Sequence, residues 1–167
     1  LLKGVKANQQ LRISYKDAVP SVDRRMKYQP ILVADTDVLS TPFVHTENVY
    51  DEYKDQVLLP HMFSRTGPFI AVGDVNGDGT DDFYIGGAAG QAGRMYAQKE
   101  DMLELQKVSA FKKDAAYEDI GTAFFDADQD GDLDLYVVSG GSEFEEGSKM
   151  YQDRLYHNNG KGGFSAA

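Results

Sequence analysis

An acidic nonapeptide that occurs twice is the feature that most constrains this sequence. Residues 74–82 read DVNGDGTDD and residues 126–134 read DADQDGDLD, so the two copies start 52 residues apart (126 − 74). In both copies, side-chain oxygens stand at positions 1, 3, 5 and 9, a glycine at position 6 permits a sharp turn, and position 7 can offer its carbonyl. Hard cations prefer this spacing of ligands, and calcium fits it best.

The residues that follow each nonapeptide predict a strand rather than a helix. An EF-hand would need a glutamate at position 12 and flanking helices, whereas position 12 is Ile85 in the first copy and Val137 in the second. Both lie in runs of β-branched and aromatic residues. A dockerin-like interpretation fails for the same reasons. The remaining alternative is that the Asp-Gly and Asn-Gly steps only form turns and bind no ion.

The repeat extends beyond the nonapeptides. Three further pairs of segments align between the copies: 70–73 with 122–125, 82–85 with 134–137, and 94–98 with 154–158. The last pair has an offset of 60, so the second copy carries eight more residues (60 − 52), within 140–152. Each copy then ends in a short fourth segment, and four strands over about 50–60 residues are typical of a β-propeller blade.

We therefore expect an all-β fold with two four-stranded antiparallel blades, forming part of a propeller and preceded by an irregular or β segment. The expected division is a first module at 1–16, an irregular linker at 17–65, and blades at 66–110 and 111–167. The tyrosines at equivalent blade positions are expected to pack between strands rather than to form a ligand platform. They are Tyr84, Tyr136, Tyr96 and Tyr156.

Composition excludes several classes of protein and site. The net charge is −10, but nine of the 27 acidic residues lie in the two nonapeptides, so much of the acidity is local. The sequence has no basic patch of the kind that would predict nucleic-acid binding. No apolar stretch approaches the roughly 20 residues of a membrane helix. The absence of cysteine excludes disulfides, thiolate metal sites and a cysteine nucleophile.

Nothing in the sequence predicts catalysis. The histidines His45, His61 and His157 show no paired metal spacing, so we expect them to be packing or surface residues. The glycine-rich segment 86–93 lacks the spacing of a phosphate-binding loop, and no G-x-S-x-G motif is present. We expect a protein without enzymatic activity and without an organic cofactor.

With these repeats, residues 74–96 and 126–164 resemble FG-GAP/VCBS-type repeats, the blades of integrin-α-like β-propellers. The resemblance covers roughly residues 66–167 and implies one calcium ion per acidic loop. The ligands it implies are the side chains of Asp74, Asn76, Asp78 and Asp82 with the carbonyl of Thr80, and the side chains of Asp126, Asp128, Asp130 and Asp134 with the carbonyl of Asp132. Such propellers have about seven blades, so the resemblance implies either that a parent chain supplies the others or that the two blades form an open wedge.

A second resemblance concerns the N-terminal end, where residues 2–15 are similar to the last strands of an ASPIC/UnbV domain. Together the two resemblances imply a calcium-binding, non-catalytic repeat module of a larger exported protein. We expect it to mediate adhesion by binding a glycan or protein through residues 86–93 and 140–152. Two alternatives are a calcium-dependent, lyase-like enzyme acting on polysaccharides and a purely structural spacer.

The type of metal site also predicts a compartment. Open, loop-borne calcium sites usually bind at about 10⁻⁴ to 10⁻³ M, which suits an extracellular, cell-surface or periplasmic location and leaves such sites empty in the cytosol.

Overall fold

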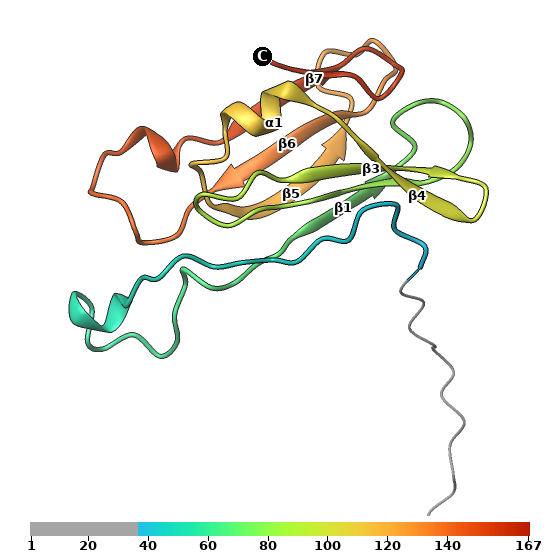
Figure 1. Cartoon of the computed structure of the whole chain (residues 1–167). Helices are drawn as coiled ribbons and strands as arrows, with labels where there is room; N and C mark the ends of the chain where they lie inside the picture. The colour runs from blue at the N-terminus through green and yellow to red at the C-terminus, as the bar shows by residue number, and fades with distance from the viewer. Residues whose placement is uncertain (1–36) are drawn as a thin grey trace, which may run out of the picture. The chain divides into compact units, whose positions relative to one another are not determined.

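The computed structural model describes residues 37–167. The expected ASPIC/UnbV-like module at 1–16 and the first part of the expected linker lie outside the described residues. The described part is all-β, with two four-stranded antiparallel sheets and little helix (Figure 1). This confirms the predicted fold class at the level of its strands and sheets. The two sheets do not close into a ring within the described residues, so the propeller interpretation stays a prediction.

Both sheets are meanders in which strands adjacent in sequence pair with one another. The first sheet consists of β1 (Ile70–Gly73), β2 (Asp82–Ile85), β3 (Arg94–Lys99) and β4 (Met102–Gln106). The second consists of β5 (Asp119–Phe125), β6 (Asp134–Ser139), β7 (Arg154–Asn158) and β8 (Phe164–Ala166). Every strand expected from the sequence repeat is therefore present.

The two sheets also share their strand register. Ala71 of β1 lies opposite Tyr84 of β2, and Ala123 of β5 lies opposite Tyr136 of β6, which is the same pair moved by 52 residues. A one-residue slip would turn every side chain to the other face, so equal register means that equivalent residues face equivalent directions. The sequence repeat is thus a repeat of three-dimensional structure.

The short helix α1 (Ser109–Lys113) connects the two sheets and places Phe111 between them. The Phe111 ring meets Tyr84 of the first sheet at 5.1 Å and Tyr156 of the second at 5.0 Å, both edge to face. These rings belong to one core cluster whose buried members are Ala71, Val75, Tyr84, Met95, Ala110, Phe111, Leu135, Val137, Tyr156 and Phe164. Because this core draws on both sheets, it holds them together as one unit.

Residues 37–69 are largely irregular and include one 3₁₀ turn, η2 (Glu52–Lys54). Their first part runs beside β4, where Leu39 forms a parallel bridge with Leu103. The hydroxyl of Tyr96 donates a 2.7 Å hydrogen bond to the carbonyl of Thr41, which adds a second tie to the sheet. This segment therefore covers the outer edge of the first sheet and reduces the backbone that β4 exposes.

No helix among the described residues is long and apolar enough to cross a membrane.

Candidate metal-binding loops

Each acidic nonapeptide forms the loop between the first and second strands of its sheet, and both loops lie at the same end of the molecule (Figure 1). At position 6, Gly79 has φ +87° and Gly131 has φ +96°, in the left-handed region that favours glycine. The expected role of these two glycines is thereby confirmed. Position 4 is also left-handed in both loops, as Gly77 (φ +75°) and Gln129 (φ +66°), so the two backbones follow the same path.

The aspartate at position 1 organises each loop. Asp74 accepts hydrogen bonds from the backbone N–H groups of positions 4, 5 and 6 at 2.8, 3.2 and 2.8 Å. Asp126 accepts the same three bonds at 2.7, 3.2 and 3.1 Å. A carboxylate oxygen that accepts one or two N–H groups can still coordinate a cation, because a carboxylate offers about four lone-pair sites. These bonds therefore hold the loop in shape and leave a metal-binding role open.

The aspartate at position 9 has an anchoring role that the sequence analysis did not anticipate. Asp82 is fully buried, and its carboxylate accepts the backbone N–H of Val75 at 3.2 Å and that of Gln98 at 2.9 Å. Asp134 is buried in the same way and accepts from Ala127 at 3.0 Å and from Asn158 at 2.8 Å. Each of these carboxylates thus ties its loop to the third strand of its own sheet.

Burial also affects the charge at position 9. Burial is the main cause that raises the pKa of Asp82, and repulsion from Asp78 and Asp74 raises it further, while the two backbone hydrogen bonds act in the opposite direction. A bound cation would relieve both the burial penalty and the repulsion.

The second loop presents a preformed group of carboxylates. Asp126, Asp128 and Asp130 are exposed, and one carboxylate oxygen of each lies within 4.8 Å of the others. Oxygens that surround a calcium ion at about 2.3–2.6 Å can lie up to about 5 Å apart, so this spacing fits calcium. Burial and the neighbouring carboxylates, chiefly Asp130, raise the pKa of Asp132, which reflects the density of negative charge in this loop.

The first loop has the same backbone but a less concentrated set of charges. The Oδ1 of Asp78 accepts from both the N–H and the hydroxyl of Thr80, and these bonds lower the pKa of Asp78. Asn76 accepts from the N–H of Asp78 at 2.9 Å and donates its amide to Asp82 at 3.2 Å. Among the described residues, the carboxylates of this loop do not form a three-membered group like that of the second loop.

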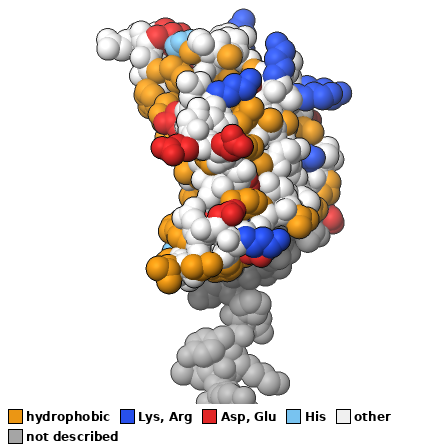
Figure 2. Space-filling view, turned by 90° about the vertical axis from the view of Figure 1, so that its left-hand side faces the viewer, with side chains coloured by type: hydrophobic (Ala, Val, Ile, Leu, Met, Phe, Trp, Pro, Cys, Tyr) orange, Lys and Arg blue, Asp and Glu red, His pale blue; other side chains and the backbone are white. Residues whose placement is uncertain are grey.

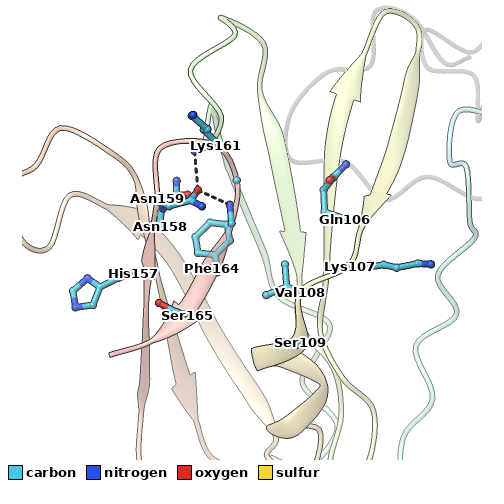
Figure 3. A pocket seen from close by; sticks show the side chains of 12 residues that line it. Gln106, Lys107, Val108, Ser109, His157, Asn158, Asn159, Lys161, Phe164 and Ser165 are labelled. Atoms are coloured by element: carbon cyan, nitrogen blue, oxygen red, sulfur yellow. Dashed lines mark hydrogen bonds between the residues drawn. The ribbon is translucent and has the colours of Figure 1, made fainter.

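Asn158 of β7 connects the two loops, because its side-chain amide donates to the carbonyl of Leu133 in the second loop at 3.1 Å and also reaches Val75 in the first. The carbonyl of Val75, in the first loop, accepts hydrogen bonds from the side chain of Asn158 at 2.7 Å and from the N–H of Gly162 at 3.1 Å. Gly162 belongs to the β7–β8 turn, which lines a pocket of about 510 Å³ together with the residues that join β4 to α1 (Figure 3). His157 is one of the residues that line this pocket, and in Figure 3 its ring points away from the other labelled side chains.

His157 instead faces the second acidic loop. Its Nδ1 lies 3.6 Å from Asp128 and 3.5 Å from Asp134, and it has no hydrogen-bond partner. From the sequence, His157 is expected to be a packing or surface residue, and its place beside the loop is evident only from the structure. The sequence repeat does contain a signal for this position. At the offset of 60, His157 aligns with Ala97, and each directly precedes the residue whose N–H binds the aspartate at position 9.

The two segments expected to contact a partner converge at the opposite end of the sheets. In 86–93, the N–H of Ala89 donates a 2.5 Å hydrogen bond to the carboxylate of Glu118. In 140–152, the N–H of Gly140 donates to the carbonyl of the same residue at 3.1 Å. Glu118 carries no local sequence signal, because its importance depends on contacts with two distant loops.

Several acidic groups surround this meeting point. Burial is the main cause that raises the pKa of Glu118 to about 8, and repulsion from Glu47 and Glu143 contributes. Glu52 of η2 is buried and accepts hydrogen bonds from the N–H of Ser64 at 3.2 Å and from the hydroxyl of Ser142. Figure 2 looks onto this end of the molecule, where acidic side chains are exposed among hydrophobic ones.

Comparison with known proteins adds no family to this description. The chain matches no protein-family model, and a search of curated proteins finds no match to it either.

Proposed function

We propose that residues 66–167 are two neighbouring blades of an FG-GAP/VCBS-type, integrin-α-like β-propeller that binds one calcium ion in each acidic loop. The observation that carries this proposal is the pair of strand-connecting loops with the same backbone path and the same hydrogen bonds to position 1. In the second of them, three carboxylates already lie within reach of one ion. Calcium would act as a structural ion that neutralises the acidic loops.

The exposed apolar side chains on the outer faces of the two sheets support the interpretation that the two blades are part of a larger ring. On β1, Ala71 packs in the core, while Ile70 and Val72 point the other way and are 54% and 61% exposed. On β5, Phe124 packs against the core and Phe125 is 45% exposed. Apolar side chains on both outer faces are what two blades taken from a propeller would present, since each blade normally packs between two others. The remaining blades would come from the parent chain.

In this proposal the module is non-catalytic and takes part in adhesion to a glycan or a protein. The two irregular segments at 86–93 and 140–152 share the meeting point at Glu118, so they form one continuous candidate contact surface. Loops carried on a rigid sheet are common binding elements. Weak loop-borne calcium sites suit an exported protein, either extracellular, on the cell surface or periplasmic.

Calcium binding is tested by calorimetric titration of chelator-treated protein, combined with thermal melts. We expect two sites in the unaltered chain and loss of one site each in Asp78→Ala and Asp130→Ala. At a Kd of about 0.1 mM and about 1 mM calcium, each site adds roughly 1.4 kcal/mol to the free energy of unfolding. Asp101→Ala removes an exposed acid outside both loops and serves as the control. Absence of saturable binding, or equal binding by all three variants, would refute the proposal.

The partner surface is tested by replacing residues 144–150 with a short Gly-Ser turn. Ser142 is retained because its hydroxyl binds Glu52 and so supports the fold. We expect binding to an array of acidic and neutral glycans, or to purified extracellular-matrix proteins, to be lost while the melting temperature stays close to that of the unaltered chain. Equal binding by both proteins would exclude this loop from the contact surface, and no binding by either would favour a structural spacer.

A further inference from the structure

One difference between the two acidic loops lies where position 3 meets position 9. In the first loop, Asn76 donates its side-chain amide to Asp82, so a hydrogen bond joins the two positions. In the second loop, position 3 is Asp128 and position 9 is Asp134, and two carboxylates have no proton donor between them. His157 lies next to both of these carboxylates, and the first repeat has Ala97 at the equivalent position.

The distances in this trio are too long for hydrogen bonds. The Nδ1 of His157 is 3.5 Å from Asp134 and 3.6 Å from Asp128, whereas an N–H···O bond usually measures about 2.7–3.2 Å. The three donor atoms all lie within 4.8 Å of one another. A point equidistant from three such atoms lies about 2.0–2.4 Å from each, and the bonds from zinc to nitrogen or carboxylate oxygen are about 2.0–2.2 Å.

The donors of this trio are held in place by other groups. Asp134 is 1% exposed and is fixed by the two backbone N–H groups that it accepts. The Oδ1 of Asp128 accepts the N–H of Asp130 at 3.3 Å, and its other oxygen is the one that faces the histidine. The His157 side chain is carried by β7 and is 36% exposed, while its Nδ1 is buried beside the two carboxylates and has no hydrogen-bond partner. Such supporting contacts are typical of metal ligands.

We propose that Asp128, Asp134 and His157 form a site for a divalent transition-metal ion such as Zn²⁺ or Co²⁺, which makes the second loop chemically different from the all-oxygen first loop. Imidazole nitrogen suits zinc, cobalt and nickel, whereas calcium prefers oxygen ligands. The three protein donors leave further coordination positions for water. The inference rests on the proposed metal-binding role of the second loop, and it specifies which ion that loop prefers.

The test uses the full chain after chelator treatment, titrated with Co²⁺ and followed by its visible absorption, with Zn²⁺ calorimetry in parallel. We expect one site that His157→Ala weakens at least tenfold for both metals. The same variant, which restores the residue type of the first repeat, should keep its calcium binding in the first loop. His61→Ala removes an exposed histidine elsewhere and should bind as the unaltered chain does.

The outcomes separate this inference from the calcium proposal. Two calcium sites together with metal binding that is the same in His157→Ala would overturn the inference and leave the calcium proposal intact. If the unaltered chain binds no calcium in either loop but binds cobalt, and His157→Ala weakens that cobalt binding, only the calcium proposal is overturned. Imidazole ¹⁵N shifts provide a second readout, because a metal bound at Nδ1 shifts that nitrogen without protonating it. If Zn²⁺ leaves the His157 shifts unchanged, the site does not exist.

Discussion

The hydroxyl of Tyr84, on β2 of the first sheet, donates a 2.9 Å hydrogen bond to Asp119 at the start of β5 in the second sheet. Asp119 is buried, and it also accepts the N–H of Gly87 at 2.9 Å and pairs with the guanidinium of Arg154. One carboxylate therefore joins β2, β7 and the loop that begins at residue 86. This buried carboxylate adds a polar contact beside the aromatic core that joins the two sheets.

Removing the Tyr84 hydroxyl should weaken this junction. We expect Tyr84→Phe to lower the free energy of unfolding by about 1–2 kcal/mol, because the variant loses a buried hydrogen bond to a charged group. The measurement is urea denaturation followed by circular dichroism. Tyr136 occupies the equivalent position of the second sheet and donates to Asp153 near the surface. Tyr136→Phe is the control and should cost clearly less; equal losses in the two variants would contradict the role of the junction.

The aromatic contact at the centre of the core supports a second prediction. Phe111→Ala removes the ring that touches Tyr84, Tyr156 and Phe164, and we expect a loss of about 3–5 kcal/mol from lost burial and the resulting cavity. The melting temperature should fall accordingly. Phe125→Ala removes a ring that is 45% exposed and provides the comparison. If both variants melt at the same temperature, Phe111 does not couple the sheets.

The anchoring role of position 9 should be visible without any metal. Asp82→Ala leaves the backbone N–H groups of Val75 and Gln98 without their acceptor, so we expect a loss of about 2–4 kcal/mol even in excess chelator. Asp78→Ala, at an exposed loop position, should lower stability mainly when calcium is present. Chemical denaturation of both variants in chelator and in calcium gives the four values needed. A chelator-treated Asp82→Ala protein as stable as the unaltered chain would refute the anchoring role.

Glu118 should make stability depend on pH. Its pKa is raised from 4.5 to about 8 in the folded protein, so between these values the unfolded chain releases a proton that the folded chain retains. Raising the pH through this range therefore favours the unfolded state, and the effect levels off above about pH 8. We expect about 1–3 kcal/mol of stability to be lost in this way.

Replacing this carboxyl with an amide isolates its contribution. Glu118→Gln should gain stability relative to the unaltered chain as the pH rises from 5 to 8.5, whereas Glu146→Gln, at an exposed position of the 140–152 segment, should follow the unaltered chain. Urea denaturation at half-unit pH steps gives the two difference curves. A flat difference curve for Glu118→Gln would mean that Glu118 is ionised in the folded protein throughout this range.

The sequence alone predicted the parts of the fold that depend on local pattern. The aligned segments of the two repeats marked all eight strands, and the aligned glycines at position 6 marked the turns that Gly79 and Gly131 make. The oxygen-bearing residues of both loops could be named for the same reason. These features depend on residues close together in the chain, whose geometry is set by backbone sterics and strand pairing.

Only the tertiary structure decided which distant side chains meet. The approach of His157 to Asp128, the bond from Tyr84 to Asp119 and the convergence of two loops on Glu118 join residues 22 to 35 positions apart in sequence (157 − 128, 119 − 84, 118 − 89 and 140 − 118). Such contacts depend on how β-sheets and loops pack, and no local pattern encodes that packing. Asp82 and Asp134, at position 9, combine a local and a tertiary feature. The sequence marked them as oxygen ligands, and the fold determined that they bind the third strand of their sheet.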